Sequence, residues 1–255
     1  IYFIISLLAG VTLLISCSGE GKQVVKKELT GGWEFRQAGT EKWYPAEVPG
    51  CVHTDLLKNK QIEDPFYRMN EKDLQWIDKK DWEYRVVFTT DRSFQKMKHK
   101  EIIFKGLDTY ADVYLNDSLI LKAENMFREW KADISSLLKE GSNELRIYFH
   151  SPIKIGLEKL EKNGYPLPAA NDYSEIGGMG DKRVSIFIRK APYHFGWDWG
   201  PRLVTSGIWR PIELQGWNEA HMEDLFIRQD HITREQAEIT ALFTVYSDKE
   251  MPAML

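Results

Sequence analysis

The sequence predicts an all-β sandwich, and three observations support this fold class. Short runs in which apolar and polar residues alternate recur along most of the chain. Turn-forming residues separate these runs, whereas helical periodicity is confined to a few short segments. Of the 255 residues, 43% are hydrophobic and 28% are charged, which is the composition of a folded globular protein and not of a disordered one.

Four runs carry the strongest strand signal. They are EYRVVFT (83–89), ADVYLND (111–117), NELRIYF (143–149) and VSIFIRK (184–190). In each run every second side chain is apolar, so that a strand can bury one face and expose the other. Asn116 and Asp117 are turn formers and end the second run.

Three helical segments interrupt the strands. Residues 54–58 predict one or two turns, and residues 134–141 predict a short helix capped by Ser135 and ended by Gly141. Residues 152–163 give the clearest helix, because Ser151 can cap it, Pro152 suits its first position and Gly164 can end it. This helix is an insertion between strands.

A second set of strands begins near residues 216–220. The segment AEITALFTVYS (237–247) places Ala237, Ile239, Ala241, Phe243 and Val245 on one face. We therefore expect residues 29–217 to form one sandwich and residues 218–255 to be the start of another that is cut short, because a lone hairpin is marginally stable in water.

The first 17 residues predict an export signal, because IYFIISLLAGVTLLISC is apolar, uncharged and short for a membrane span. It ends in Leu14-Ile15-Ser16-Cys17, which resembles the lipobox of bacterial lipoproteins. The resemblance implies lipidation of Cys17 and a lipid anchor in a bacterial envelope, on the periplasmic or the outer side. A plain secretory signal or an anchor helix is the alternative. No start methionine or basic n-region is present, so we expect the natural sequence to begin upstream. Residues 18–28 predict a polar tether.

Composition argues against several functions. The formal net charge is −4 and no basic block occurs, so nucleic acid is not an expected partner. Cys51 is the one cysteine after the signal, which excludes an internal disulfide; we expect a buried or half-buried apolar residue there. The six histidines lack metal-ligand spacing, and no phosphate loop or Ser/His/Asp arrangement occurs. No metal and no cofactor is expected.

The segment HFGWDWGPR (194–202) is the main candidate site. Gly196 and Gly200 permit a tight backbone that presents Trp197 and Asp198 together. An indole can cover the apolar face of a pyranose ring, and a carboxylate can accept hydrogen bonds from two adjacent hydroxyls. In the structural alternative, Trp197 and Trp199 are core anchors and Asp198 caps a turn.

Four blocks together resemble the N-terminal sugar-binding domain of glycoside hydrolase family 2. The blocks are GLDTYADVYLND (106–117), NMFREW (125–130), LLKEGSNELRIYFHSP (137–152) and IRKAPYHFGWDWGPRLVTSGIWRPIEL (188–214). The resemblance covers residues 29–217 and implies a jelly-roll, galactose-binding-like sandwich, followed from residue 218 by an immunoglobulin-like one. The FGWDWGPR version looks most like the β-mannosidases of that family, which implies a β-mannoside oligosaccharide or glycan as substrate.

The same resemblance implies a larger, retaining enzyme. Its (β/α)8 barrel would carry two catalytic glutamates, about 5–5.5 Å apart. No barrel is present within the 255 residues, and we assign no catalytic residue here. By resemblance, Asp198 and Trp197 help line the subsite for the non-reducing mannose. Trp199 and Arg202 are possible supporting residues, with Arg202 expected to pair with Asp198.

Other residues of the blocks receive structural assignments. Asp108 and Asp112 resemble sugar-contacting side chains, although Asp112 is expected on the solvent face of a strand. Arg210 is expected to brace the last strand. Residues 71–85 predict a solvated loop and a strand entry. Trp76, Trp82 and Trp130 are assigned to the sandwich core and its rim.

Three alternative functions stay open at this point. The chain could be a non-catalytic carbohydrate-binding lipoprotein, or part of a β-glucuronidase or β-galactosidase of the same family. It could also be a sandwich with a purely structural role.

Overall fold

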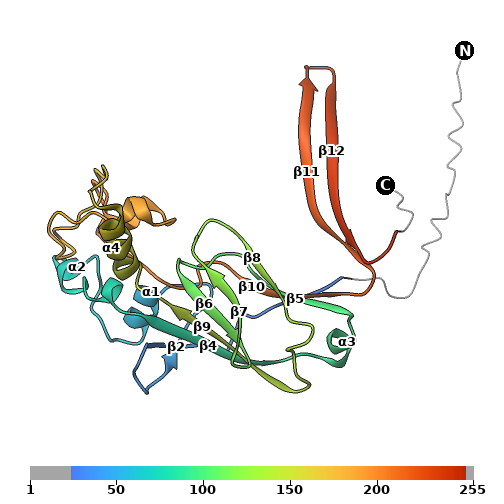
Figure 1. Ribbon diagram of the computed structural model, residues 1–255, viewed down its shortest axis with the longest axis horizontal. Helices are drawn as coiled ribbons and strands as arrows, with labels where there is room; N and C mark the ends of the chain where they lie inside the picture. The colour runs from blue at the N-terminus through green and yellow to red at the C-terminus, as the bar shows by residue number, and fades with distance from the viewer. Residues whose placement is uncertain (1–23, 251–255) are drawn as a thin grey trace, which may run out of the picture.

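The computed structural model describes residues 24–250 and confirms the all-β class (Figure 1). Two antiparallel sheets form a sandwich. One has the order β3-β2-β4-β9-β6-β7 and the other β1-β10-β5-β8. The first sheet consists of β3 (Tyr44–Pro45), β2 (Glu34–Gln37), β4 (Trp82–Thr89), β9 (Ser142–Phe149), β6 (Ala111–Leu115) and β7 (Ser118–Ala123). The second consists of β1 (Val25–Glu28), β10 (Ile212–Trp217), β5 (His99–Phe104) and β8 (Trp130–Asp133).

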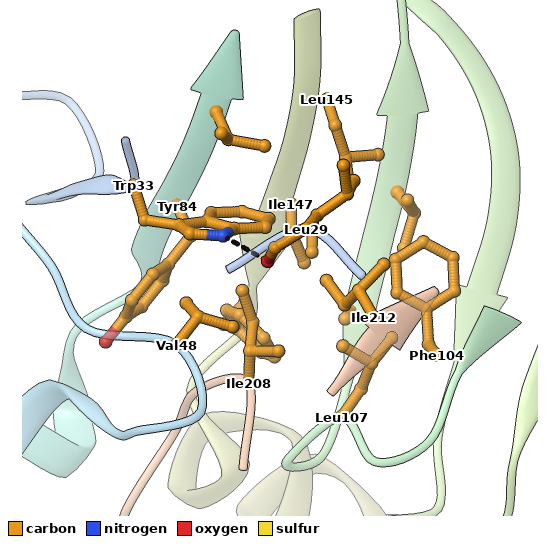
Figure 2. Close-up of a cluster of buried hydrophobic side chains, with 14 of the residues drawn as sticks. Leu29, Trp33, Val48, Tyr84, Phe104, Leu107, Leu145, Ile147, Ile208 and Ile212 are labelled. Atoms are coloured by element: carbon orange, nitrogen blue, oxygen red, sulfur yellow. Dashed lines mark hydrogen bonds between the residues drawn. The ribbon is translucent and has the colours of Figure 1, made fainter. Parts of the chain in front are cut away.

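The core lies between the two sheets (Figure 2). Leu145 and Ile147 on β9 face it from one sheet, and Phe104 and Ile212 on β5 and β10 face it from the other. Trp33 closes one side, where its indole Nε1 donates a hydrogen bond to the Leu29 carbonyl oxygen at 3.0 Å. The predicted strands 83–89, 111–117 and 143–149 are confirmed, because their alternating apolar side chains supply this core.

Short helices gather at one end of the sandwich (Figure 1). They are α1 (Val52–Lys58), α2 (Asn70–Asp73) and α4 (Pro152–Asn163), and α3 (Arg92–Gln95) lies elsewhere. Three 3-10 turns complete the set: η1 (Ile77–Lys79), η2 (Ser185–Phe187) and η3 (Pro192–Phe195). The α4 prediction is confirmed at both ends, since Ser151 Oγ accepts a hydrogen bond from the Lys154 N–H and Gly164 has a φ of 80°.

Two predicted elements are wrong. Residues 184–190 form η2 and a bend, because Asp172 Oδ2 binds the backbone N–H groups of Val184 and Ser185. Residues 134–141 form turns instead of a helix, because Asn143 Oδ1 captures the Lys139 N–H. In both places a polar side chain from elsewhere replaces the regular backbone hydrogen bonds.

The start of the chain also differs from the prediction. Residues 25–28, assigned to the tether, form strand β1 on β10, since an edge strand needs only backbone hydrogen bonds from its partner. Residues 1–17 and Cys17 lie outside the described residues. No helix within residues 24–250 is long and apolar enough to cross a membrane.

A long hairpin projects from the end of the sandwich opposite to α1, α2 and α4 (Figure 1). It consists of β11 (Ala220–Ile232) and β12 (Ala237–Ser247). The register pairs Leu225 with Phe243 and Ile227 with Ala241, which places the predicted apolar residues on one face, where Phe243 is 41% exposed. The domain boundary at 216–220 and the immunoglobulin-like identity of the second unit stay predictions.

We expect Gly156→Ala to destabilise the protein, although alanine normally stabilises a helix interior by up to about 1 kcal/mol relative to glycine. A Cβ at position 156 would lie 2.7 Å from Val184 Cβ, so α4 would have to move away from η2. The expected loss is about 1–3 kcal/mol of unfolding free energy in urea titrations. Glu158→Ala on the exposed side of α4 is the control. A gain in stability for Gly156→Ala would contradict the packing described.

Candidate functional site

The Trp-Asp-Trp turn (197–200) stands out from the surface. Trp197 pairs with Gly200 across the turn, and the Gly200 N–H donates to the Trp197 carbonyl oxygen at 3.2 Å. Trp197 is 44% exposed and Trp199 is 90% exposed, so neither is a core anchor. Phe195 fills the core position instead and is fully buried.

Asp198 at the tip is exposed and nearly free of protein contacts. Within residues 24–250 its carboxylate accepts one long hydrogen bond, from the Tyr173 hydroxyl at 3.4 Å. It caps no turn, and most of its acceptor capacity faces solvent. An exposed carboxylate beside an exposed indole is a combination that can bind a ring with several hydroxyls.

Glycine is required where the turn begins. Gly196 has a φ of 142°, and a Cβ there would lie 2.6 Å from the Tyr173 ring and 2.8 Å from the Asn171 carbonyl oxygen. The close approach lets Tyr173 reach Asp198. A larger residue at position 196 would push the turn away from residues 171–173.

Arg202 anchors the far end of the turn, but its partner is not the predicted one. Its side chain is fully buried, and Nη1 donates to Asp78 Oδ2 at 2.6 Å and to Gln75 Oε1 at 2.5 Å. Its backbone N–H donates to Glu71 Oε1 at 2.7 Å, and its carbonyl accepts from Gln75 Nε2 at 2.8 Å. The expected pair with Asp198 is therefore wrong. Three residues of the predicted solvated loop 71–85, Glu71, Gln75 and Asp78, support this arginine instead.

A hollow of about 490 Å³ lies next to the turn and is called the first hollow here. Its wall is mostly apolar and is formed by Phe66, Tyr193, Trp197, Leu203 and Pro201, with Gly200, His194 and Thr205. Phe66 is 75% exposed and Tyr193 is 59% exposed, so large aromatic surfaces face the opening. Such a wall suits the C–H face of a sugar ring better than it suits a charged ligand.

A buried polar network lies behind the first hollow. Lys190 Nζ donates to Asp108 Oδ2 and, at 3.0 Å, to Thr205 Oγ1. The Thr205 hydroxyl donates to Asp108 Oδ2 at 2.7 Å, so His194 Nδ1, 2.7 Å from the same hydroxyl oxygen, must be the donor in that contact. His194 Nε2 is then left as an acceptor.

Burial and the neighbouring Lys190 charge lower the pKa of His194 to about 4, which keeps this histidine neutral near pH 7. Burial, together with Lys190 and His194, lowers the pKa of His53 to about 3. Burial also lowers the pKa of Lys190, against the opposing effect of Asp108. The histidine beside the first hollow is thus a neutral hydrogen-bonding group.

Sequence reasoning did not assign Lys190, His194 or Thr205 to the site. Lys190 and His194 lie in the same sequence block as the turn, 188–214, and this proximity could have identified them as site residues. Asp108 was noted as a possible sugar contact, but it is buried as the partner of Lys190. Asp112 lies elsewhere and pairs with His150 at 3.0 Å and Lys122 at 3.6 Å.

The remaining candidate residues make contacts within the protein that fit a structural role. Trp82 is buried in the core and Trp130 packs partly against it, while Trp76 is 38% exposed. The Arg210 guanidinium lies 5.0 Å from the Trp209 ring centre. Cys51 is half-buried, and burial raises the pKa of its thiol, which argues against a nucleophilic role. Within residues 24–250 no group of three metal-ligating side chains comes together.

Comparison with known proteins places the chain in a family. Residues 33–210 match the family described as "Glycosyl hydrolase 2 galactose-binding domain-like". The chain is 32% identical to "Beta-mannosidase" of Capra hircus over 247 residues, 95% of this chain and 28% of that protein. It is 36% identical to "Beta-mannosidase B" of Thermothelomyces thermophilus over 228 residues, 87% of this chain and 25% of that protein.

Solved structures agree with these matches. The β-D-mannosidase from Dictyoglomus thermophilum matches with a TM-score of 0.78 and 40% identity, over 88% of this chain and 26% of that chain. A β-glucuronidase from an uncultured Clostridium matches with a TM-score of 0.57 at 16% identity, over 91% of this chain and 35% of that chain, which shows a shared fold alone. The chain thus spans about a quarter of the length of the mannosidases it matches.

We expect Arg202→Met to destabilise the protein by about 3–5 kcal/mol, because the substitution leaves Asp78 buried without its cation. The double variant Arg202→Met with Asp78→Asn should recover part of the loss, since no uncompensated charge remains. Urea unfolding of both variants measures this. Equal stability of the wild type and Arg202→Met would contradict the buried pairing of Arg202 with Asp78.

We expect acid to destabilise the fold through the buried histidines. Their pKa values in the folded protein lie below the unfolded value near 6.5, so the unfolded state binds protons first as the pH falls. The unfolding free energy should therefore fall between pH 6.5 and about 4, by up to about 1.4 kcal/mol per pH unit for each such proton. His53→Met should reduce this slope in urea titrations across the range. An unchanged slope would contradict a neutral, buried His53.

Proposed function

Because the chain belongs to the glycosyl hydrolase 2 galactose-binding domain-like family, we propose that it is the N-terminal part of a retaining β-mannosidase. The whole enzyme hydrolyses terminal, non-reducing β-D-mannose residues of an oligosaccharide or glycan. Support comes from relatives named β-mannosidase at 32–36% identity and from a β-D-mannosidase structure at 40% identity. A barrel outside this chain supplies the two catalytic carboxylates, and this chain alone is inactive.

The exposed carboxylate of Asp198 on an anchored turn is the observation that carries the role of this domain. In the proposed complex Asp198 accepts hydrogen bonds from two adjacent hydroxyls of the mannose, and Trp197 covers an apolar face of the ring. Hydrogen bonds to a carboxylate are stronger than those between neutral groups, so one aspartate can fix the orientation of the sugar. Trp199, which is almost fully exposed, is free to pack on the barrel.

The charge of Asp198 also favours mannose over glucuronic acid. A glucuronide carries a carboxylate of its own, which the Asp198 carboxylate would repel at close range. A terminal mannoside carries no charge, and its free hydroxyl groups can donate hydrogen bonds to the Asp198 carboxylate. β-Glucuronidase activity is therefore a weaker proposal than β-mannosidase activity.

We also propose that the protein is exported and lipid-anchored through Cys17. Support comes from the sequence alone, namely an apolar run that ends in a lipobox-like tetrapeptide. The lipid is then the only contact with the membrane. Labelling of the protein with a radioactive fatty acid in a bacterial host, lost in Cys17→Ser, would test the anchor.

We expect Asp198→Ala, in the protein encoded by the complete gene, to lower kcat/KM for an aryl β-mannoside by about 30- to 1000-fold, the equivalent of about 2–4 kcal/mol of transition-state binding. Its unfolding free energy should stay within about 0.5 kcal/mol of wild type, because the side chain is exposed. Asp181→Ala, which removes another exposed carboxylate, is the control. Unchanged kcat/KM would leave the turn a structural role, and hydrolysis of a β-glucuronide or β-galactoside instead would reassign the substrate.

A further inference from the structure

A second hollow, of about 670 Å³, also borders η3. Residues 125–127, 169–172 and 185–192 contribute to its wall. The two hollows share one segment of chain: Pro192 borders the second, whereas Tyr193 and His194 border the first. Lys190 lines the second hollow and donates to Thr205, which lines the first. The two hollows therefore border the same short segment of chain.

A fixed loop holds an aromatic ring at the second hollow. Asn125 Oδ1 accepts from the Phe127 N–H at 2.9 Å, and the Met126 N–H donates to the Arg189 carbonyl oxygen at 3.0 Å. The Met126 carbonyl accepts from Trp209 Nε1 at 3.1 Å, and the Met126 side chain is buried. The Phe127 ring is 60% exposed. The loop comes from the NMFREW block, to which the proposed mannose subsite gives no role.

Two charged groups accompany this ring. Asp172 is 1% exposed, and its Oδ2 accepts from the N–H groups of Val184 and Ser185 at 2.7 and 2.8 Å. Its Oδ1 is buried and has no hydrogen-bond partner within residues 24–250, which is costly for a carboxylate oxygen. Arg189 is exposed and makes no ion pair within the same residues. Both side chains line the hollow.

We propose that the second hollow is a binding subsite for a further pyranose ring of the oligosaccharide, a neutral hexose. Phe127 covers the C–H face of this ring, Asp172 Oδ1 accepts a hydrogen bond from one hydroxyl, and the Arg189 guanidinium donates to another. The charges of Asp172 and Arg189 compensate each other, which suits a neutral sugar. The inference rests on the proposed function, because it adds a second contact to the saccharide whose terminal mannose lies at Asp198.

The test compares a substrate that reaches the second hollow with one that does not. In the protein encoded by the complete gene, Phe127→Ala should lower kcat/KM for β-1,4-linked mannotriose about tenfold and leave kcat/KM for methyl β-mannoside within twofold. Asp172→Asn should act in the same direction, since the amide oxygen can keep both backbone hydrogen bonds while an NH₂ group replaces the acceptor at Oδ1. Tyr165→Ala removes an aromatic ring that is 62% exposed and lines a different hollow, so it should leave both substrates unchanged.

An unchanged ratio of the two kcat/KM values in both Phe127→Ala and Asp172→Asn would overturn the inference and leave the proposed function intact. If the wild type hydrolyses neither mannoside, the proposed function fails, and calorimetric titration with mannotriose tests the hollow directly. Weaker binding in Phe127→Ala than in Tyr165→Ala would then support the subsite. Equal binding in the two variants, or no binding to the wild type, would refute it.

Discussion

The buried ion pair between Arg202 and Asp78 is the interaction on which the position of the candidate site depends. The Trp-Asp-Trp turn has few contacts of its own, so its location is set by the residues that flank it. Arg202 fixes the residues that follow the turn to Glu71 in α2, to Asp78 in η1 and to Gln75 between them. A buried pair of this kind gains little net stability, because desolvation offsets the attraction, but it restricts the two side chains to one geometry. We infer that the pair is retained to place the turn.

A second buried ion pair, between Lys190 and Asp108, fixes the position of the residues that precede the turn. Between the two pairs, Phe195 fills a small core formed with α4 and η2, and Gly196 allows the chain to pass close to Tyr173. Fixed flanks and an exposed tip are what a loop needs if it is to complete a site on a neighbouring domain, because the tip is then positioned before the ligand arrives. In the proposed complex, the second hollow, which also borders η3, extends this surface beyond one sugar ring.

How far the sequence predicts the structure depends on the range of the interactions involved. Strand β9 and helix α4 follow from local patterns, since alternation and the Ser151 cap are encoded within a few residues. Residues 184–190 alternate equally well but do not form a strand, because Asp172 binds their backbone. The partners of Arg202 and Lys190 lie 124 and 82 residues away in sequence, so no local pattern could identify them. Trp197 and Asp198 could be identified because the nine residues 194–202 contain both the side chains that suit a sugar and the glycines that present them. The buried network that supports them could not be identified from the sequence.

The central claim is that this sandwich lends Asp198 to a mannose subsite that another part of the protein completes. A crystal structure of the protein encoded by the complete gene, with a mannose-configured inhibitor bound, tests it most directly. The account predicts Asp198 carboxylate oxygens within about 3 Å of two adjacent hydroxyls of the inhibitor, with Trp197 against the ring. An inhibitor bound in the barrel with no contact to Asp198 or Trp197 would contradict it.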